Sequence, residues 1–344
     1  MFLNKQNNQN MKVLFIGGTG NISKECSKLA IAQGIDLYHL NRGMSNIEIP
    51  GVKTLIADFK DQAQVEAVVS NHYFDVVVNF IAFFPEDVER DISIFQGKTK
   101  QYNFISTASA YQKPVSHPII TESTPLANPY WQYSRDKIAC EDLLMKAYRE
   151  TGFPITIVRP SHTYDMVIPA AIGSWADFTL IDRMRMGKKV IIHGDGTSLW
   201  VMTHSIDFAK GFNGLLGLPQ AIGHSFHITS DEVLNWNQIY SMMADAAGVE
   251  LNAVHISTDF ICDTMESLNL GSLRGNLFGD KANSVIFDNT KIKRFVPGYN
   301  AVIPFAQGIK KTINWFDEDP GRKVISEANN RMMDKLLEVY QGKL

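Results

Sequence analysis

Tyr133 and Lys137 are the residues whose types and spacing most directly suggest chemistry. They lie at the start of a predicted helix, Tyr133–Thr151, and residues four apart on a helix share one face. A tyrosine titrates near ~10 in water, and a neighbouring ammonium stabilises the phenolate. We therefore expect Lys137 to lower the pKa of Tyr133, so that the phenol can take a proton from a substrate alcohol. The same spacing also fits a partly buried aromatic ring beside a solvated lysine.

A second candidate group lies in the hydroxyl-rich segment Ser106-Thr107-Ala108-Ser109, which follows the predicted strand Gln101–Ser106. A hydroxyl beside the Tyr133 phenol can hydrogen-bond the same substrate oxygen during proton transfer. The strand and the helix must therefore place this segment next to Tyr133.

A glycine-rich turn connects the first predicted strand, Lys12–Gly17, to the first predicted helix, Gly20–Gln33. Gly17 permits a tight turn, and Gly20 lets the backbone approach a pyrophosphate that the helix N-terminus attracts. Ser23 takes the place of the third glycine of the usual pattern and is small enough for close helix–strand packing. Between a strand and a helix the pattern predicts dinucleotide binding, with a purely structural turn as the alternative. The predicted binding residues are Gly17, Gly18, Thr19, Gly20, Asn21 and Ile22.

The second predicted strand, Ile35–Leu40, should end near the adenosine ribose of such a dinucleotide. An acidic residue there would favour NAD, whereas this chain has Asn41 and Arg42. Arg42 can pair with a 2′-phosphate, which slightly favours NADP, or it is a solvated loop cation. Asp58 follows the third predicted strand and is placed either to reach the adenine amino group or to cap the helix that starts near Asp61.

The elements that position these residues alternate between short apolar runs and amphipathic stretches. This order predicts an α/β fold with a Rossmann-type, doubly wound parallel sheet. The predicted strands are Lys12–Gly17, Ile35–Leu40, Lys53–Ala57, Asp75–Phe80, Gln101–Ser106 and Pro154–Arg159, and the predicted helices are Gly20–Gln33, Asp61–His72, Pro85–Phe95 and Tyr133–Thr151.

The second half of the chain predicts a smaller C-terminal α/β cap. After the irregular stretch Asp165–Gly187, Val190–His193 and Leu199–His204 flank a Gly-Asp-Gly turn, which is typical of a hairpin. Further predicted elements are the helix Ser205–Leu216, the strand Ser225–Thr229, the helix Asn235–Ala247 and the helix Ala328–Val339. We expect a disordered lead-in at 1–10, a dinucleotide-binding domain at 11–165 with returning segments at about 190–230, a cap at 166–189 and 231–320, and a C-terminal helix within 321–344.

The composition is that of an ordinary soluble globular protein. The chain has 344 residues, 45% of them hydrophobic and 20% charged, with a net charge of -3. That charge argues against nucleic-acid and membrane partners. Three widely spaced cysteines and scattered histidines predict neither disulfides nor a metal site. We see no apolar run of the ~20 residues that a membrane helix needs, and expect a cytoplasmic protein.

In this order the motifs resemble those of the extended short-chain dehydrogenase/reductase superfamily, in its branch of NAD-dependent epimerases and dehydratases. The resemblance runs from about Met11 to Trp315. The motifs that carry it are Gly17-Gly18-Thr19-Gly20, Asp58, Phe80-Ile81-Ala82, Ser106–Tyr111, Tyr133-x-x-x-Lys137, Val158-Arg159-Pro160 with Tyr164, and Gly194-Asp195-Gly196-Thr197 before His204 and Asp207.

The resemblance implies a role for each matching position. Tyr133 would be the acid/base, Lys137 would hold the nicotinamide ribose, and Thr107 would be the catalytic hydroxyl, with Ser109 as the fallback. Further cofactor contacts would come from Phe59, Phe80, Ile81, Ala82, Ser106, Pro160, Ser161 and His162. Substrate contacts would come from Phe83, Ser109, His162 and Trp200, although His162 also fits an ordinary position at the edge of the core.

The chain departs from the family pattern at several positions. Trp200 stands where nucleotide-sugar epimerases usually carry an arginine that grips the diphosphate, so an apolar, aromatic or uncharged sugar substrate is favoured. Ala108 and Ser109 replace the acid pair of a dehydratase. The short helix Pro85–Phe95 leaves monomer or homodimer open.

Two functions follow from this pattern. The first is an NAD(P)-dependent oxidoreductase or epimerase that acts on a small hydroxyl or carbonyl substrate. The alternative is a non-catalytic or RNA-associated member, similar to chloroplast stem-loop RNA-binding proteins of the same fold.

Overall fold

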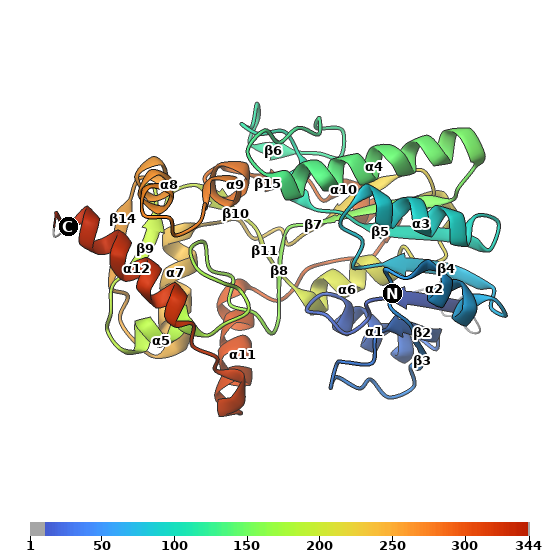
Figure 1. Ribbon diagram of the computed structural model, residues 1–344, viewed down its shortest axis with the longest axis horizontal. Coiled ribbons are helices and arrows are strands. Elements are labelled where there is room, and N and C mark those ends of the chain that lie inside the picture. The colour runs from blue at the N-terminus through green and yellow to red at the C-terminus, as the bar shows by residue number, and fades with distance from the viewer. Residues whose placement is uncertain (1–10, 343–344) are drawn as a thin grey trace.

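The computed structural model describes residues 11–342, and a seven-stranded sheet lies in its right-hand part in Figure 1. All of its strand pairs are parallel, and the order is β12-β7-β5-β4-β1-β2-β3. The predicted Rossmann-type sheet is confirmed, with strand ends that differ from the prediction by no more than two residues. The strands are β1 (Lys12–Ile16), β2 (Asp36–Asn41), β3 (Lys53–Ile56), β4 (Phe74–Asn79), β5 (Thr99–Ile105), β7 (Ile155–Pro160) and β12 (Ser225–Ile228).

Helices cover both faces of this sheet because its strands are apolar on both sides. Val13 and Phe15 of β1 pack into one core cluster, whereas Leu14 and Ile16 pack into another. The first cluster includes residues of α1 (Ser23–Ala32), α6 (Ser205–Asn213) and α10 (Thr290–Phe295). The second includes residues of α2 (Gln62–Val69), α3 (Pro85–Phe95) and α4 (Gln132–Thr151).

Strand order places the candidate residues at one edge. Because β1 lies between β2 and β4, the chain reverses its winding direction at the turn after β1. In open parallel sheets ligands bind at the carboxyl ends of the strands, in the crevice at this switch point. The segments that follow β1, β4, β5 and β7 all reach this edge.

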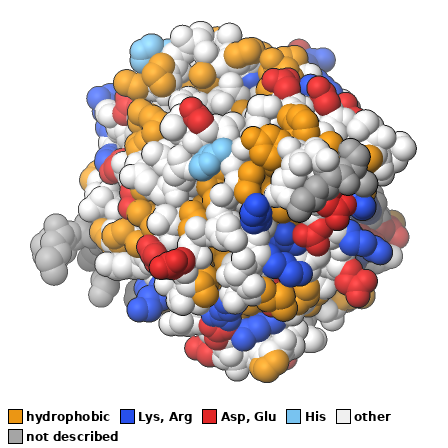
Figure 2. All heavy atoms as spheres, turned by 90° about the vertical axis from the view of Figure 1, so that its left-hand side faces the viewer, with side chains coloured by type: hydrophobic (Ala, Val, Ile, Leu, Met, Phe, Trp, Pro, Cys, Tyr) orange, Lys and Arg blue, Asp and Glu red, His pale blue; other side chains and the backbone are white. Residues whose placement is uncertain are grey.

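A third core cluster forms a separate region, which we call the cap region. Its helices are α5 (Thr179–Arg185), α7 (Trp236–Ala247), α8 (Thr258–Ser267), α11 (Phe305–Asp317) and α12 (Glu327–Tyr340). They lie to the left of the sheet in Figure 1. The C-terminal helix was predicted, but α8 and α11 were not. Figure 2 shows acidic, basic and hydrophobic side chains interspersed on the outer face of this region.

The hairpin predicted between Val190 and His204 is wrong. β9 (Val190–His193) pairs in parallel with β14 (Ala253–Ile256) instead. The Gly194–Gly196 turn exists, with both glycines at positive φ, but the Asn237 side chain at the start of α7 packs against it. The flanking segments are buried and find strand partners far away in the chain. The other short pairs are β10 (Leu199–Trp200) with β13 (Leu234–Asn235), β11 (Met202–His204) with β8 (His162–Tyr164), and β15 (Ile286–Phe287) with β6 (Ile119–Ile120).

The remaining elements are short. They are η1 (Ala108–Ala110), η2 (Pro219–Ala221), α9 (Arg274–Asn276), the π-helical turn η3 (Leu277–Lys281) and η4 (Pro320–Arg322). The predicted lead-in at 1–10 lies outside the described residues. Across residues 11–342, no helix combines the length and apolarity needed to cross a membrane.

Candidate active site

A cavity of about 710 Å³ lies at the carboxyl edge of the sheet and extends to the cap region. It brings together most of the residues that the sequence predicted to contact the cofactor or the substrate. These are Gly17, Gly20, Asn21, Ile22, Phe80, Ile81, Phe83, Ser106, Thr107, Ser109, Tyr133, Lys137, Pro160, Ser161, His162 and Trp200.

The glycine turn is shaped by close contacts that exclude side chains. Gly17 has φ +83°, and a Cβ on Gly18 would lie 2.3 Å from the imidazole of His39. Ser23 does more than allow close packing, because its hydroxyl donates to the Gly17 carbonyl at 2.7 Å and accepts from the Gly20 amide at 2.9 Å. The serine that replaces the third glycine therefore ties the turn together.

Asn21 fastens this turn to the segment after β7. Its side-chain amide donates to the Thr163 carbonyl at 2.9 Å and accepts from the Met166 amide at 3.2 Å. These bonds link the glycine turn to the strand that carries His162.

The residues predicted after β2 and β3 lie beyond the cavity wall. The Asn41 side chain accepts from the Gly43 amide at 2.9 Å, and Arg42 is exposed. Phe59 is buried in the core, with the Arg90 guanidinium 4.1 Å from its ring centroid. The capping alternative for Asp58 is wrong, since Asp61 caps α2.

Lys137 is a buried ammonium between two strand ends. Its Nζ donates to the Ala82 carbonyl at 2.6 Å and to the Ile105 carbonyl at 2.8 Å. Burial lowers the pKa of Lys137 to about 8. Ala82 itself is fully buried and meets this site through its backbone, as its amide donates to the Asn79 side chain.

Tyr133 does not behave as its spacing from Lys137 predicted. Burial raises the pKa of Tyr133 to about 12, with the Thr107 hydroxyl acting in the opposite direction. The expectation that Lys137 lowers this pKa is wrong in this structure, because the ammonium is directed to two backbone carbonyls. At neutral pH the phenol is protonated, so its hydroxyl is available to donate.

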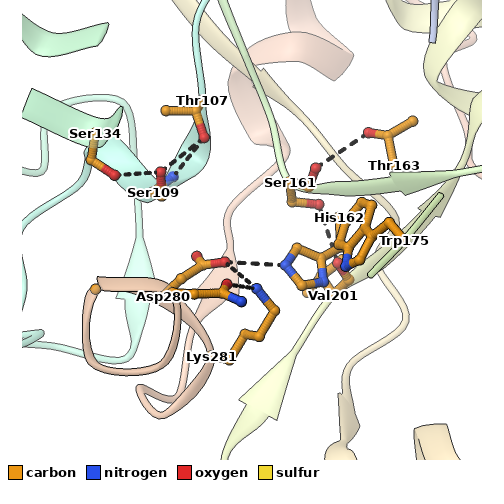
Figure 3. Close-up of polar contacts among 12 residues, drawn as sticks. Thr107, Ser109, Ser134, Ser161, His162, Thr163, Trp175, Val201, Asp280 and Lys281 are labelled. Carbon is orange, nitrogen blue, oxygen red and sulfur yellow. Dashed lines mark hydrogen bonds and ion pairs between the residues drawn. The ribbon is translucent and has the colours of Figure 1, made fainter. Parts of the chain in front are cut away.

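Three hydroxyls support the Tyr133 side of the cavity (Figure 3). Thr107 Oγ1 and Ser109 Oγ lie 3.0 Å apart, and Ser109 Oγ lies 2.7 Å from Ser134 Oγ. Ser134 follows Tyr133 directly in α4. The chain of hydroxyls therefore fixes the Thr107 segment to the start of that helix.

Comparison with known proteins identifies the family of this chain. The model of the NAD dependent epimerase/dehydratase family matches residues 13–229, which is more than half of the chain. The chain belongs to this family. The match spans the glycine turn, Thr107, Tyr133, Lys137 and Trp200.

Curated relatives of this family member are distant. It is 26% identical over 230 residues to 3beta-hydroxysteroid-dehydrogenase/decarboxylase isoform 2 of Arabidopsis thaliana, covering 58% of this chain and 38% of that protein. It is 23% identical over 275 residues to a bifunctional pinoresinol-lariciresinol reductase of Forsythia intermedia, covering 74% of this chain and 82% of that protein. The chain spans half the length or less of the first two curated relatives it matches.

Solved structures show that the fold extends beyond the matched residues. The epimerase Mth375 of Methanothermobacter thermautotrophicus has a TM-score of 0.75 at 15% identity, covering 92% of this chain and 95% of that one. A dTDP-glucose 4,6-dehydratase of Bacillus anthracis, solved in complex with NAD, has a TM-score of 0.71 at 17% identity, covering 90% and 98% of the two chains.

Sequence reasoning missed two charged residues that line the cavity from outside the family match. Asp280 and Lys281 are 4% and 2% exposed and belong to the π-helical turn η3. Figure 3 shows the Asp280 carboxylate facing the His162 imidazole, with Oδ2 to Nε2 at 3.1 Å and to Lys281 Nζ at 3.4 Å. No motif in the sequence marks either residue.

His162 and Trp200, both predicted as substrate contacts, lie beside this charged pair. The His162 ring packs edge-on against Trp200 and Trp175, with centroids 5.0 Å and 4.7 Å away. Burial, aided by the Lys281 ammonium, lowers the pKa of His162 to about 4. This end of the cavity therefore combines indole rings with a neutral imidazole and one ion pair.

Proposed function

We propose that the chain is an NAD(P)-dependent oxidoreductase or epimerase of the extended short-chain dehydrogenase type. The observation that carries the proposal is the convergence of Tyr133, Thr107 and Lys137 with the glycine turn in one cavity. The hydroxyl, the phenol and the ammonium line the same cavity as the glycine turn, where Gly17 and Gly20 carry no side chains. The substrate is a small compound with a hydroxyl or carbonyl group.

The geometry of the cavity fits a dinucleotide. Gly17 and Gly20 would take the pyrophosphate, and the buried Lys137 ammonium would face the nicotinamide ribose. The nicotinamide supplies hydride acceptance or delivery. The chain's own residues bind this group and handle the proton.

Tyr133 supplies the proton-transfer group. In the direction of carbonyl reduction, its protonated hydroxyl donates to the substrate oxygen as negative charge develops there. Thr107 hydrogen-bonds the same oxygen, and in alcohol oxidation the transfers run in reverse. Ser109 and Ser134 hold Thr107 in place through the bonds described above. An epimerase would return hydride within one visit of the substrate, whereas a reductase would exchange the cofactor.

Cofactor choice is the finer part of the proposal. NAD is named with structural neighbours of 17% identity. We nevertheless propose a slight preference for NADP, because Arg42 is exposed at the end of β2 and no acidic residue stands at Asn41.

The alternative function, a non-catalytic or RNA-associated member of the fold, stays a hypothesis. A complete Tyr133, Lys137 and Thr107 set and the net charge of -3 favour the enzyme. The absorbance spectrum of the purified protein tests this alternative. Bound nicotinamide that changes on addition of alcohols or ketones indicates an enzyme.

Tyr133→Phe is the direct test of the proposal. We expect turnover of reduced cofactor with a ketone panel to fall by about 10²- to 10⁴-fold, because the proton donor is lost. Cofactor affinity should stay the same. The matched control is Tyr130→Phe, which removes the hydroxyl of an exposed tyrosine three residues earlier. Unchanged turnover in Tyr133→Phe would contradict the mechanism.

A further inference from the structure

The π-helical turn η3 is built to hold two charged side chains against the cavity. The Lys281 carbonyl accepts hydrogen bonds from His193 Nε2 at 3.1 Å, from Ser198 Oγ at 3.0 Å and from Trp236 Nε1 at 3.0 Å. The three donors come from β9, from the loop after it and from α7. Such convergence fixes the backbone of the turn, and single π turns occur frequently at functional sites.

The other side of the turn is fastened to the loop before α4. The Asn128 amide donates to the Gly279 carbonyl at 2.7 Å and to the Ser109 carbonyl at 2.8 Å. A Cβ on Gly279 would lie 2.9 Å from Cβ of Trp131. These contacts therefore fix the position of the turn relative to Ser109 and to the helix that carries Tyr133.

The groups offered to a ligand at this end are electrically balanced. Asp280 and Lys281 form an ion pair, in which burial lowers the pKa of the lysine and the carboxylate opposes that shift. His162 is neutral near pH 7 because burial lowers its pKa. Burial raises the pKa of Asp280, but the Lys281 ammonium and the His162 hydrogen bond outweigh it, so the carboxyl is ionised. Lys113 is also buried and lies outside the cavity lining, so its positive charge acts on Asp280 without being offered to a ligand. Its Nζ lies 5.8 Å from the Trp200 ring centroid.

Indole rings complete this end of the cavity. Trp131, Trp175 and Trp200 line it, and Lys281 Nζ lies 5.9 Å from the ring centroids of both Trp131 and Trp175. Flat rings offer apolar surface to C–H groups, whereas the carboxylate accepts and the ammonium donates hydrogen bonds. A ligand that satisfies all three features carries several hydroxyls on a carbon skeleton.

We infer that Asp280 and Lys281 form a subsite that selects an uncharged polyhydroxylated substrate, such as a free ketose or a glycoside, over a nucleotide sugar. This inference rests on the proposed function and names its substrate class. Asp280 accepts from one substrate hydroxyl and Lys281 donates to a neighbouring one, while the reacting carbon faces Tyr133 and Thr107.

A nucleoside diphosphate does not fit the same subsite. Its negative charges would be buried beside the Asp280 carboxylate. Lys281, the cation next to that carboxylate, is already paired with it, and Lys137 donates to two backbone carbonyls. Burying charge without full compensation is unfavourable. Within residues 11–342, the cavity lining contains no arginine that could form a bidentate phosphate contact.

The test is ligand binding to the cofactor-loaded protein, measured by calorimetry. The neutral probes are D-xylulose, D-fructose and methyl β-D-glucoside, and the anionic probe is UDP. The variants are Asp280→Asn, Lys281→Met and the double variant, each checked for thermal unfolding. Asp245→Asn, at an exposed position in α7, is the matched control.

We expect at least one neutral probe to bind the wild-type protein and to lose about tenfold or more in affinity in each single variant, because a hydrogen bond to a charged group is lost. UDP should bind more tightly to Asp280→Asn than to the wild type, since removal of the carboxylate leaves the ammonium free. The double variant should lose the neutral probe without gaining UDP.

Three results would overturn the inference: no neutral probe binds, Asp280→Asn leaves neutral binding unchanged, or UDP binds the wild type more tightly than any neutral probe. Binding needs no turnover, so the two proposals can fail separately. Tyr133→Phe should bind the neutral probe normally while it loses activity. Suppose that Tyr133→Phe keeps its turnover while Asp280→Asn loses affinity for the neutral probe and gains affinity for UDP. The proposed chemistry would then be wrong, and the subsite would stand.

Discussion

The sheet and the cap region contribute to the same cavity in different ways. In the sheet, the functional residues follow strand ends or start helices, so parallel strand order alone brings Gly17, Thr107 and Pro160 to one edge. In the cap region, Asp280 and Lys281 reach the cavity through a short turn held by distant donors. The comparison indicates that the proposed catalytic groups are positioned by the regular scaffold, whereas the proposed substrate subsite is positioned by irregular contacts.

The largest expected difference between the two regions concerns their buried arginines. In the sheet, Arg159 donates to Glu141 from Nε at 2.9 Å and from Nη2 at 2.5 Å, and both residues are buried. In the cap region, Arg183 pairs with Asp334 at 2.7 Å, but the Asp334 side chain is 48% exposed. Water can therefore replace Asp334 as a partner of Arg183, but it cannot replace Glu141 as a partner of Arg159.

We predict that Glu141→Gln lowers the free energy of unfolding by about 3–5 kcal/mol, because it leaves a buried guanidinium without its counter-charge. Asp334→Asn should cost about 1 kcal/mol or less, because Asp334 is half-exposed and Arg183 keeps its hydrogen bonds to Asn330 and to the Lys189 carbonyl. Urea-induced unfolding of both variants measures the difference. Equal losses would show that the sheet and the cap region do not differ in this respect.

The second prediction separates packing from ligand binding within the glycine turn. Gly18→Ala should lower the free energy of unfolding by about 1–3 kcal/mol, because the new methyl group meets the His39 ring. At Gly20 a Cβ would lie 3.5 Å from Ser23 Oγ, an ordinary contact, so Gly20→Ala should fold normally. It should nevertheless weaken dinucleotide binding by roughly tenfold, since the methyl group faces the pyrophosphate position.

Thermal unfolding and cofactor titration of both variants measure these effects. His39→Ala removes the ring that the new methyl group would meet, so the double variant should lose less stability than the sum of the two single losses. If Gly20→Ala bound the cofactor like the wild type, the assignment of this turn to the pyrophosphate would be wrong. The main contacts of the dinucleotide would then be expected in the cap region.

The sequence predicted the residues of the sheet because their signals are local. A turn between a strand and a helix, or Tyr133 and Lys137 four residues apart, is recognisable within a short window of sequence. The parallel order follows from apolar runs buried on both faces. These two facts bring the glycine turn, Thr107 and Tyr133 together without knowledge of any long-range contact.

The remaining features depend on contacts that no window contains. The pKa of Tyr133 is raised by burial, and Lys137 is directed to carbonyls of two separate segments. The predicted hairpin failed because β9 pairs with a strand beyond α7. Asp280 and Lys281 reach the cavity because η3 is held on both sides, and nothing in the local sequence indicates that a π turn forms there.

The smallest expected effect concerns the preference for NADP over NAD. It tests whether residues of the sheet alone determine this preference. Arg42 is exposed, so its pairing with a 2′-phosphate should be worth about 1 kcal/mol. Arg42→Ala should therefore shift the ratio of NADP to NAD affinity by about fivefold toward NAD. Lys281→Met, which changes the lining of the cavity beside the cap region, should leave this ratio unchanged. Titration of both cofactors against both variants measures it. If the ratio of NADP to NAD affinity did not change in Arg42→Ala, the role given to Arg42 would be wrong. If the ratio changed in Lys281→Met, cofactor and substrate recognition would not be divided between the sheet and the cap region.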